Sequence, residues 1–398
     1  MAWEKVSDIR WERPHSDLTP ALEDAWKRIC YEQPQIASTV DGMKKVYEIP
    51  DTKALEEWLE STFAVSTASD AEELYVSVKP IKQATLYYIP KSSELVFRGH
   101  NHMIDGTGVL LFWHSYLEAL SSPNANIEFG NESARLAPTM EQALGYPEQT
   151  TQEMSEKAKA LFAGLTSGGP GIGLVSQSGV APSGNCQNAE LVLPVATTDA
   201  LVAACKSKGV TVTAAVHAAY IGAIVKHVDP NSNASQYVTA NQFNLRSFLP
   251  EPYSSSKYAA SVYYTPFPYR ADLPASYWDL AKSLHKYYQT SFKGNPKALG
   301  LNEPLTRDLC RDVQTPEFLD EFLERPVPKD ALVSSLGVAE RYDLTIGVDV
   351  VIGMSMFFFT FRDQLRLMYS FNDGFEKRED IQQYLEEVKS ILIRELLA

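Results

Sequence analysis

The stretch Phe97-Arg-Gly-His-Asn-His-Met-Ile-Asp-Gly-Thr-Gly-Val109 places two histidines, one aspartate and three glycines in a single short segment. The alternating residues Glu94 to Arg98 predict a β-strand just before it, and the apolar residues Val109 to Leu120 predict a buried helix just after it. Two of the seven histidines of the chain therefore lie in one strand-to-helix loop. This concentration of polar groups makes the loop the first candidate for a functional site.

Helices and strands are predicted to alternate on both sides of this loop. Before it, Asp51 is expected to cap a helix, and the predicted elements are helices over 18–31 and 52–63 and strands over 45–49, 74–78 and 84–89. After it, strands are predicted over 189–194, 237–244, 259–267, 332–336, 349–352, 355–361 and 364–370. The predicted helices of this half cover 197–207, 212–227, 273–292, 316–322 and 378–397. This alternation is typical of an α/β protein with mixed sheets.

A segment rich in Gly, Ser and Pro, residues 164–188, separates the two halves. It contains Gly168-Gly-Pro-Gly-Ile-Gly173, but no strand precedes these glycines and no helix follows directly, so the pattern does not favour a nucleotide loop. A connecting segment is the better interpretation. The sequence thus predicts an N-terminal lobe of residues 1–163, a crossover linker over 164–188, and a C-terminal lobe of residues 189–398.

The composition limits the classes of partner. Hydrophobic residues make up 44% of the chain, which excludes wholesale disorder, and the formal net charge is −14 with a pI near 5.1. Such an acidic chain argues against nucleic acid and against an anionic membrane, because both attract clustered positive charge. The four cysteines lie far apart without metal-ligand spacing. We therefore expect a cytoplasmic monomer with free thiols, no bound metal and no membrane-spanning segment.

At the loop, the chain resembles the CoA-dependent acyltransferase superfamily, whose shared signature is H-x-x-x-D-G, often H-H-x-x-x-D-G. Members include chloramphenicol acetyltransferase, the condensation domains of peptide synthetases, the BAHD acyltransferases and the fungal trichothecene-type O-acetyltransferases, to which it is most similar. Further segments match in order: Gly209-Val-Thr-Val-Thr213, Asn241-Gln-Phe-Asn-Leu-Arg-Ser-Phe248, Val333-Ser-Ser-Leu-Gly337 and Ser370-Phe-Asn-Asp-Gly-Phe-Glu376. The resemblance covers residues 20 to 395 and implies two chloramphenicol-acetyltransferase-like lobes with a central channel.

The resemblance also implies a chemistry. A neutral histidine of the signature takes the proton of a hydroxyl or amine as that group attacks the thioester of acyl-CoA, a step worth roughly 10²–10⁴ in rate. In the family the aspartate holds the loop through an arginine. By this resemblance Asp105, Gly106 and Arg246 form the structural part of the motif, with Arg98 and Arg28 as other possible partners of Asp105.

The signature is altered in this chain. Four residues before Asp105 stands Asn101, whose amide cannot take a proton near neutral pH. His100 occupies the first-histidine place of the doubled signature and His102 a variable place. Either Asn101 faces the channel, or one of the two histidines does and acts as the base. Because alternate side chains of an extended loop share a face, we expect His100 and His102 to point to the same side.

Three other residues are candidates for binding substrate. Tyr263 belongs to the alternating aromatic segment Tyr258 to Thr265, which could line an apolar pocket. Ser335 lies at a strand end where the family presents a hydroxyl, and His114 lies within the predicted buried helix.

Two functions are consistent with these residues. The first is an acyltransferase of natural-product (secondary) metabolism that transfers an acyl group from CoA to a hydroxyl or amine of a small apolar metabolite; it needs no cofactor beyond acyl-CoA as co-substrate. The second is a repurposed acyltransferase fold that catalyses a cyclisation, a rearrangement or a pericyclic step, because Asn101 replaces the base histidine. In that case the loop orients the substrate by hydrogen bonds.

Overall fold

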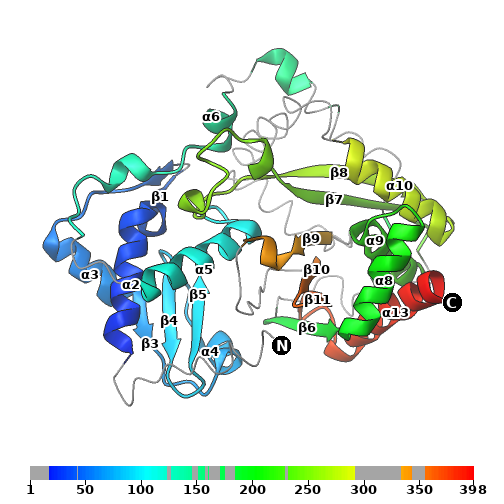
Figure 1. The fold of residues 1–398 in the computed structure, drawn as a ribbon, viewed down its shortest axis with the longest axis horizontal. Helices are drawn as coiled ribbons and strands as arrows, with labels where there is room; N and C mark the ends of the chain where they lie inside the picture. Colours follow the sequence, from blue (N-terminus) through cyan, green and yellow to red (C-terminus); the bar gives the residue numbers. More distant parts are fainter. Residues whose placement is uncertain are drawn as a thin grey trace. The chain divides into compact units, whose positions relative to one another are not determined.

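The computed structural model describes residues 18–42, 44–122, 127–145, 151–156, 160, 171–174, 184–228, 232–291, 333–342 and 355–398. It is a mixed α/β protein that divides into two compact units (Figure 1). Unit 1 comprises residues 1–103 and 112–137, and unit 2 comprises residues 104–111 and 138–398. The division runs through the loop that carries the altered signature, so each unit is described separately.

Unit 1 is built around a three-stranded mixed sheet of β3 (Phe63–Val65), β4 (Thr85–Ile89) and β5 (Glu94–Arg98). Strand β3 is parallel to β4, and β5 is antiparallel to β4. Helices α2 (Thr19–Glu32) and α5 (Gly106–Ser121) lie over this sheet (Figure 1). Outside it are the helices α3 (Thr52–Thr62) and α4 (Ala71–Ser77) and the short hairpin of β1 (Thr39–Asp41) and β2 (Lys44–Val46).

Tryptophan 26 is the centre of the core of unit 1. Its fully buried ring stacks on Trp58 at 5.4 Å between centroids and meets Phe97 and Phe112 edge-on. The indole N–H donates to the Thr62 hydroxyl at 3.1 Å, so burial leaves this polar group paired. These contacts join α2, α3, α5 and β5, and they place the end of β5, where the signature loop begins, on a rigid support.

The larger sheet of unit 2 has the strand order β6-β11-β10-β9. Its strands are β6 (Cys186–Val192), β9 (Val333–Val338), β10 (Ser355–Phe361) and β11 (Gln364–Asn372). Only the β9–β10 pair is parallel. Helices α8 (Val195–Ser207), α9 (Val212–His227) and α13 (Arg378–Leu397) share one apolar core with this sheet.

A second sheet in unit 2 is the long antiparallel hairpin of β7 (Gln236–Asn244) and β8 (Tyr264–Asp272). Helix α10 (Tyr277–Thr290) lies against this hairpin and against α9 (Figure 1). The smaller helices of this unit are α6 (Met140–Leu144) and the 3-10 turns η3 (Arg246–Phe248), η4 (Ser256–Tyr258) and η6 (Ala339–Tyr342). Unit 1 has two further 3-10 turns, η1 (Pro34–Ala37) and η2 (Glu132–Arg135).

Two sequence predictions of local structure were wrong. Residues Leu74 to Val78, expected as a strand, lie in and just after helix α4, because Asp70 caps this helix by accepting from the Glu73 N–H and Glu72 and Glu73 occupy its first turn. The strand expected from Ala259 begins later, at Tyr264, after the turn η4. The expected elements at 316–322 and 349–352 lie outside the described residues.

The division between the two units falls between Ala137 and Pro138 and at 103–104 and 111–112. The physical reason is that Met140 and Ala143 of α6 pack against Leu245, Leu249 and Tyr263 in a core cluster of unit 2. The lobes expected over 1–163 and 189–398 and the crossover linker expected over 164–188 stay a prediction. Most of the expected linker lies outside the described residues.

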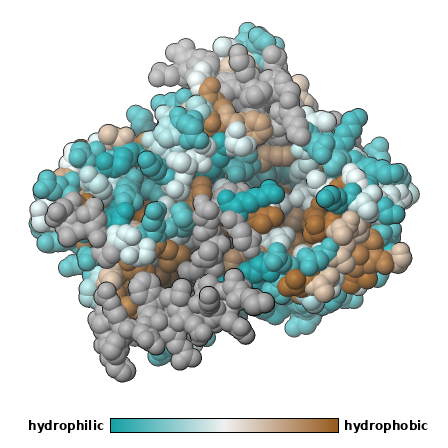
Figure 2. Space-filling model, viewed as in Figure 1, coloured by the Kyte–Doolittle hydropathy of each residue, from teal (hydrophilic) through white to brown (hydrophobic). Residues whose placement is uncertain are grey.

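The surface is mixed in character. Figure 2 shows apolar side chains among polar ones on the face it draws, and the exposed apolar residues of unit 2 include Val195, Val202, Val225, Ile393 and Leu397. Among the residues that the structure describes, no single helix is long and apolar enough to cross a membrane; α8 and α9 reach that length only together, as a pair bent by 102°.

The structure describes the side chains of two of the four cysteines. Cys30 and Cys205 are buried free thiols, as expected. Burial raises the pKa of Cys30, and it raises the pKa of Cys205 to about 11, so neither thiol is ionised at neutral pH. The side chain of Cys186 and all of Cys310 lie outside the described residues.

Candidate functional site

The aspartate of the signature is held by a buried clamp in unit 2. Asp105 is the N-cap of α5: its Oδ1 accepts from the Gly108 N–H at 2.7 Å, and its Oδ2 accepts from the Tyr263 N–H at 2.7 Å. Nη1 of Arg246 donates to both carboxylate oxygens at 2.8 Å. The Asp105 N–H donates to the Ser261 carbonyl at 3.1 Å. The carboxylate is therefore saturated with partners and is fixed in place.

The guanidinium of Arg246 is equally well held. Its Nη2 donates to the Ser261 hydroxyl at 3.0 Å, and its charged carbon lies 5.4 Å from the centroid of the Tyr263 ring. The Asn244 side chain accepts from the Arg246 N–H at 3.0 Å. Arg246 is 3% exposed and Asp105 8%, so neither group is free to touch a substrate. Among the three arginines named from the sequence, Arg246 is the partner of Asp105.

A glycine is required next to this clamp at position 108, two residues after the glycine of the signature. Gly106 is the first residue of α5 and has no left-handed backbone angle. A Cβ added to Gly108 would collide with the Ala259 carbonyl oxygen and would approach Nη2 of Arg246 to 3.1 Å. The tight approach of α5 to the segment 259–261 therefore depends on Gly108.

The three candidate catalytic residues form a turn at the edge of unit 1. The Met103 N–H donates to the His100 carbonyl at 2.9 Å, which places Asn101 and His102 at the two central positions of the turn. Both central side chains are exposed, and His100 is half-buried. The rings of His100 and His102 stack with 5.0 Å between centroids and 16° between planes. The two histidines thus share a side, as expected, although a turn rather than an extended strand brings them together.

The two imidazoles differ in their partners. Nε2 of His100 lies 3.0 Å from the Ile81 carbonyl oxygen. Because that oxygen can only accept, Nε2 carries the hydrogen and the lone pair of a neutral His100 is on Nδ1. For His102, no ring nitrogen has a hydrogen-bond partner among the described residues. Desolvation, then the neighbouring His100 and then Lys45, lower the pKa of His102.

The candidate substrate-binding residues lie on three different segments of the chain. The buried Tyr263 donates its hydroxyl to the Pro138 carbonyl at 3.0 Å and packs on Arg246, so its described contacts belong to the clamp. Ser335 is half-buried on β9, and its hydroxyl lies 3.3 Å from that of Thr213 on α9. His114 is half-buried on α5.

Sequence reasoning missed several participants. Gly108 and Ile81 act through the absence of a side chain and through a backbone carbonyl, which no residue pattern reveals, and Ser261 acts through both its backbone and its hydroxyl. Lys45 lies more than fifty residues before the loop, and its charge is the smallest of the three contributions that lower the pKa of His102. His217 is completely buried, and its ring nitrogens lie 2.8 Å from the Tyr288 hydroxyl and 2.9 Å from the Tyr237 hydroxyl.

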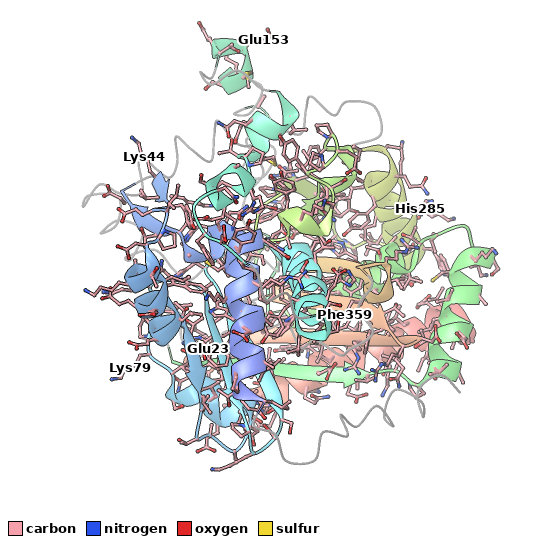
Figure 3. All side chains as sticks on the ribbon, turned by 60° about the vertical axis from the view of Figure 1, so that its left-hand side comes forward. Glu23, Lys44, Lys79, Glu153, His285 and Phe359 are labelled. Carbon is pink, nitrogen blue, oxygen red and sulfur yellow. The ribbon has the colours of Figure 1, made fainter. Side chains whose placement is uncertain are left out.

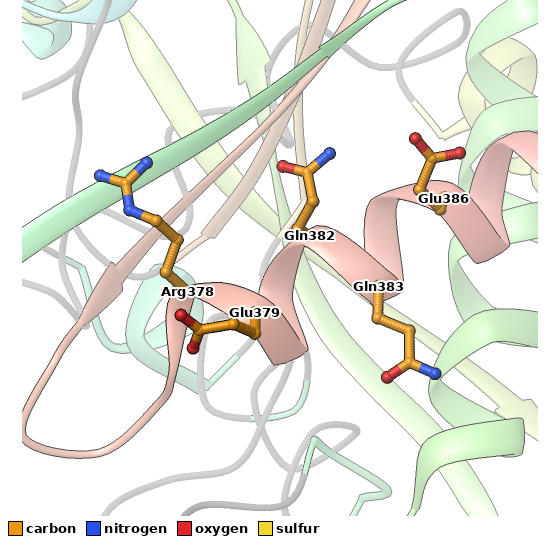
Figure 4. Close-up of a pocket in the computed structure, with 5 residues that line it drawn as sticks. All are labelled: Arg378, Glu379, Gln382, Gln383 and Glu386. Atoms are coloured by element: carbon orange, nitrogen blue, oxygen red, sulfur yellow. The ribbon is translucent and has the colours of Figure 1, made fainter.

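A metal centre and a pocket with catalytic groups are two further kinds of site to consider among the described residues. Within it, no group of three or more His, Cys, Asp or Glu side chains is placed to hold a metal ion. A surface depression of about 510 Å³ lies along α13 (Figure 4). Its described lining consists of polar side chains of this one helix, namely Arg378, Glu379, Gln382, Gln383 and Glu386. Nothing in that lining combines a nucleophile or base with an orienting group.

Comparison of the structure with solved structures decides the fold. The trichothecene 15-O-acetyltransferase TRI3 from Fusarium sporotrichioides superposes with a TM-score of 0.77 over 94% of this chain and 86% of that one, at 16% sequence identity. The chain has the two-lobed fold of the CoA-dependent acyltransferases. The comparison thereby confirms the fold that the resemblance at the signature implies.

Sequence comparison agrees along nearly the whole chain, although no family model matches it. The acetyltransferase pigO of Monascus ruber is 27% identical over 96% of this chain and 86% of its own length. The O-acetyltransferase pigM of the same organism is 28% identical over 96% of this chain and 77% of its own length. The protein is thus similar to fungal O-acetyltransferases throughout the chain that carries the clamp and the turn.

Proposed function

We propose that this protein is an acyltransferase that moves an acyl group from CoA to a hydroxyl or amine of a small apolar metabolite in natural-product metabolism. The observation that carries this proposal is the exposed, stacked imidazole of His102, three residues from a carboxylate that is clamped inside unit 2. A neutral imidazole next to a rigid anchor is what general-base catalysis requires. Similarity to the fungal acetyltransferases pigO and pigM and to TRI3 supports the reaction class.

The proposed reaction begins when His102 takes the proton of the attacking hydroxyl. The oxygen forms a bond to the thioester carbon, and the carbon–sulfur bond then breaks. The leaving CoA thiolate recovers the proton from the His102 imidazolium, so the ring ends neutral and free CoA is released. The lowered pKa of His102 keeps the ring unprotonated near neutral pH, which is the form that this first step needs.

In this proposal His100 and Asn101 act beside the base. His100 is held by the Ile81 carbonyl and forms the surface on which the His102 ring rests. Asn101 is exposed at the turn and offers an amide that can donate to a developing oxyanion. Asp105 and Arg246 take no part in proton transfer, because both are buried and paired with each other.

Release of free CoA tests the proposal. Purified protein is incubated with acetyl-CoA and longer acyl-CoA donors and with a panel of polyketide, terpenoid and peptide alcohols and amines, and free thiol is measured. We expect turnover with at least one pair and a loss of about 10²-fold or more in His102→Ala. His285→Ala, in α10 of unit 2 (Figure 3), is the control and should retain activity. Absence of thiol release with every pair, while a related acetyltransferase is active, would refute the proposal.

A second function is favoured by one specific observation, the exposed Asn101 at the position of the family's base. An amide there can hold a polar substrate but cannot accept its proton. The alternative is a cyclisation, rearrangement or pericyclic reaction in which hydrogen bonds from the turn fix the conformation of the substrate. Asn101→His separates the two functions: under acyl transfer by His102 it changes an existing activity only modestly. If it creates a strong transferase from an inactive protein, the alternative is correct.

A further inference from the structure

The turn that carries Asn101 and His102 ends on a buried methionine. The side chain of Met103 is 3% exposed, whereas those of Asn101 and His102 are exposed and that of His100 is half-buried. The Met103 N–H donates to the His100 carbonyl at 2.9 Å and so closes the turn. Met103 is therefore both the last residue of the turn and the point at which the turn enters the buried part of the protein.

The end of the Met103 side chain lies beside Gly99, in space that this glycine leaves free. A Cβ built on Gly99 would lie 2.8 Å from Cε of Met103 and 3.1 Å from the Phe97 ring. The Met103 methyl group and the edge of the Phe97 ring therefore border the same space, which is the seat of Met103. Gly99 has no left-handed backbone angle, so what it supplies is room and not a special backbone conformation.

Phe97 makes the seat of Met103 rigid. The Phe97 ring lies 4.2 Å from the Phe112 ring and 6.2 Å from the Trp26 ring, measured between centroids. Trp26 is fully buried at the centre of the core of unit 1. Because a closely packed core resists displacement, the contact with Phe97 ties the position of Met103 to that core.

We propose that Met103 and Gly99 are positioning residues for His102: Met103 anchors one end of the turn, and Gly99 provides the space for that anchor. This inference rests on the proposed function, in which His102 is the base. The other end of the turn is held by the hydrogen bond from Nε2 of His100 to the Ile81 carbonyl at 3.0 Å. With both ends fixed, the stacked His102 ring keeps one place from which it takes the proton of the substrate.

Two opposite changes of volume should disturb this anchor. Met103→Ala empties the seat, and Gly99→Ala adds a methyl group where the Met103 methyl group lies. Because a displacement of about 1 Å can cost up to about 10²-fold in rate, we expect each change to lower kcat about tenfold and to leave KM nearly unchanged. Leucine fills a similar volume but ends one atom sooner than methionine, so Met103→Leu should keep kcat within about threefold. For the same reason, Gly99→Ala/Met103→Leu should be more active than Gly99→Ala alone.

The experiment combines these kinetics with an NMR signal that needs no turnover. In protein labelled with ¹³C-histidine, a nuclear Overhauser effect between the ring protons of His100 and His102 reports the stacking at 5.0 Å, and His102→Gln assigns it. We expect this signal in the natural protein, in Met103→Leu and in the double variant, and its loss in Met103→Ala and in Gly99→Ala. Met368→Ala is the matched control, because Met368 is also 3% exposed but lies on β11 of unit 2. It should lower the Tm and leave both the signal and kcat unchanged.

Three results would overturn the inference: a stacking signal that survives in Met103→Ala or Gly99→Ala, a double variant no more active than Gly99→Ala, or an equal loss of kcat in Met368→Ala. The NMR signal separates this inference from the proposed function. If it follows the expected pattern in a protein that releases no CoA with any donor, the anchor is correct and the acyl-transfer proposal fails. If CoA is released and every variant keeps the signal and kcat of the natural protein, the proposed function holds and the positioning role of Met103 fails.

Discussion

Arg246 and Asp105 are 141 residues apart in the chain, yet one guanidinium nitrogen lies 2.8 Å from both carboxylate oxygens, in the interior of unit 2. The pair joins the start of α5 to the end of β7. Because Asp105 also caps α5 and accepts from the Tyr263 N–H, a single carboxylate determines where the signature loop leaves unit 2.

Removing one partner of this buried pair should be strongly destabilising. Arg246→Met leaves the Asp105 carboxylate without its counter-charge, and we expect a loss of about 3–5 kcal/mol in the free energy of unfolding, measured by urea denaturation. Lys53→Met is the control, because the exposed pair Lys53–Glu57 should contribute less than about 1 kcal/mol. A loss in Arg246→Met as small as that in Lys53→Met would contradict the assigned role of the clamp.

Gly108→Ala should disturb the contact between α5 and the segment 259–261. The added methyl group would meet the Ala259 backbone, which cannot move aside as a flexible side chain can, so we expect a loss of about 1–3 kcal/mol and a lower Tm. Gly222→Ala in α9 is a matched helical control. Its Cβ would meet only the end of the Ile391 side chain at 3.1 Å, and the gain in helix propensity offsets this. Equal losses in both variants would disprove the specific requirement at Gly108.

Stability should fall in acid because of His217. Burial lowers its pKa to about 3, against about 6.5 in the unfolded chain. Between these values the unfolded state binds the extra proton, so the free energy of unfolding decreases as the pH falls below 6.5. Between pH 7 and pH 5 this amounts to about 2 kcal/mol. We expect the free energy of unfolding of His217→Gln to decrease less between pH 7 and pH 5 than that of the natural protein. Denaturation of both proteins at pH 7 and at pH 5 measures the difference. Parallel losses in the two proteins would show that His217 is not the responsible group.

Glu376 should give a dependence of the opposite sign. Burial raises its pKa to about 7, from about 4.5, while the side chain lies near the tyrosines 220, 369 and 384. Between pH 4.5 and pH 7 the folded state keeps the proton on Glu376, whereas the unfolded state loses it. The free energy of unfolding therefore decreases as the pH rises from 4.5 to 7, and this contribution no longer changes above pH 7. Glu376→Gln should remove about 2–3 kcal/mol of this loss between pH 5 and pH 8. A Glu376→Gln protein with an unaltered pH profile of unfolding would contradict the burial of this carboxyl.

Much of the fold could be predicted where local rules dominate. Asp51 caps α3 as expected, and α9 and α13 begin and end where their apolar spacing indicates. The prediction failed at Leu74 to Val78, whose β-like alternation is overridden by the cap at Asp70. The packing of α6 against Leu245, Leu249 and Tyr263 could not be predicted from the sequence, since it joins segments about a hundred residues apart.

The sequence by itself determined the type of the protein: its helices and strands, the altered signature at residues 100–106 and, through the ordered motifs, its fold. Those features are local, because capping, periodicity and residue spacing act over a few neighbours. The tertiary structure decided that Asp105 pairs with Arg246 and that His100 stacks on His102 with its hydrogen on Nε2. These are relations between distant segments, and only the packed chain brings the groups close enough for charge and hydrogen bonds to act.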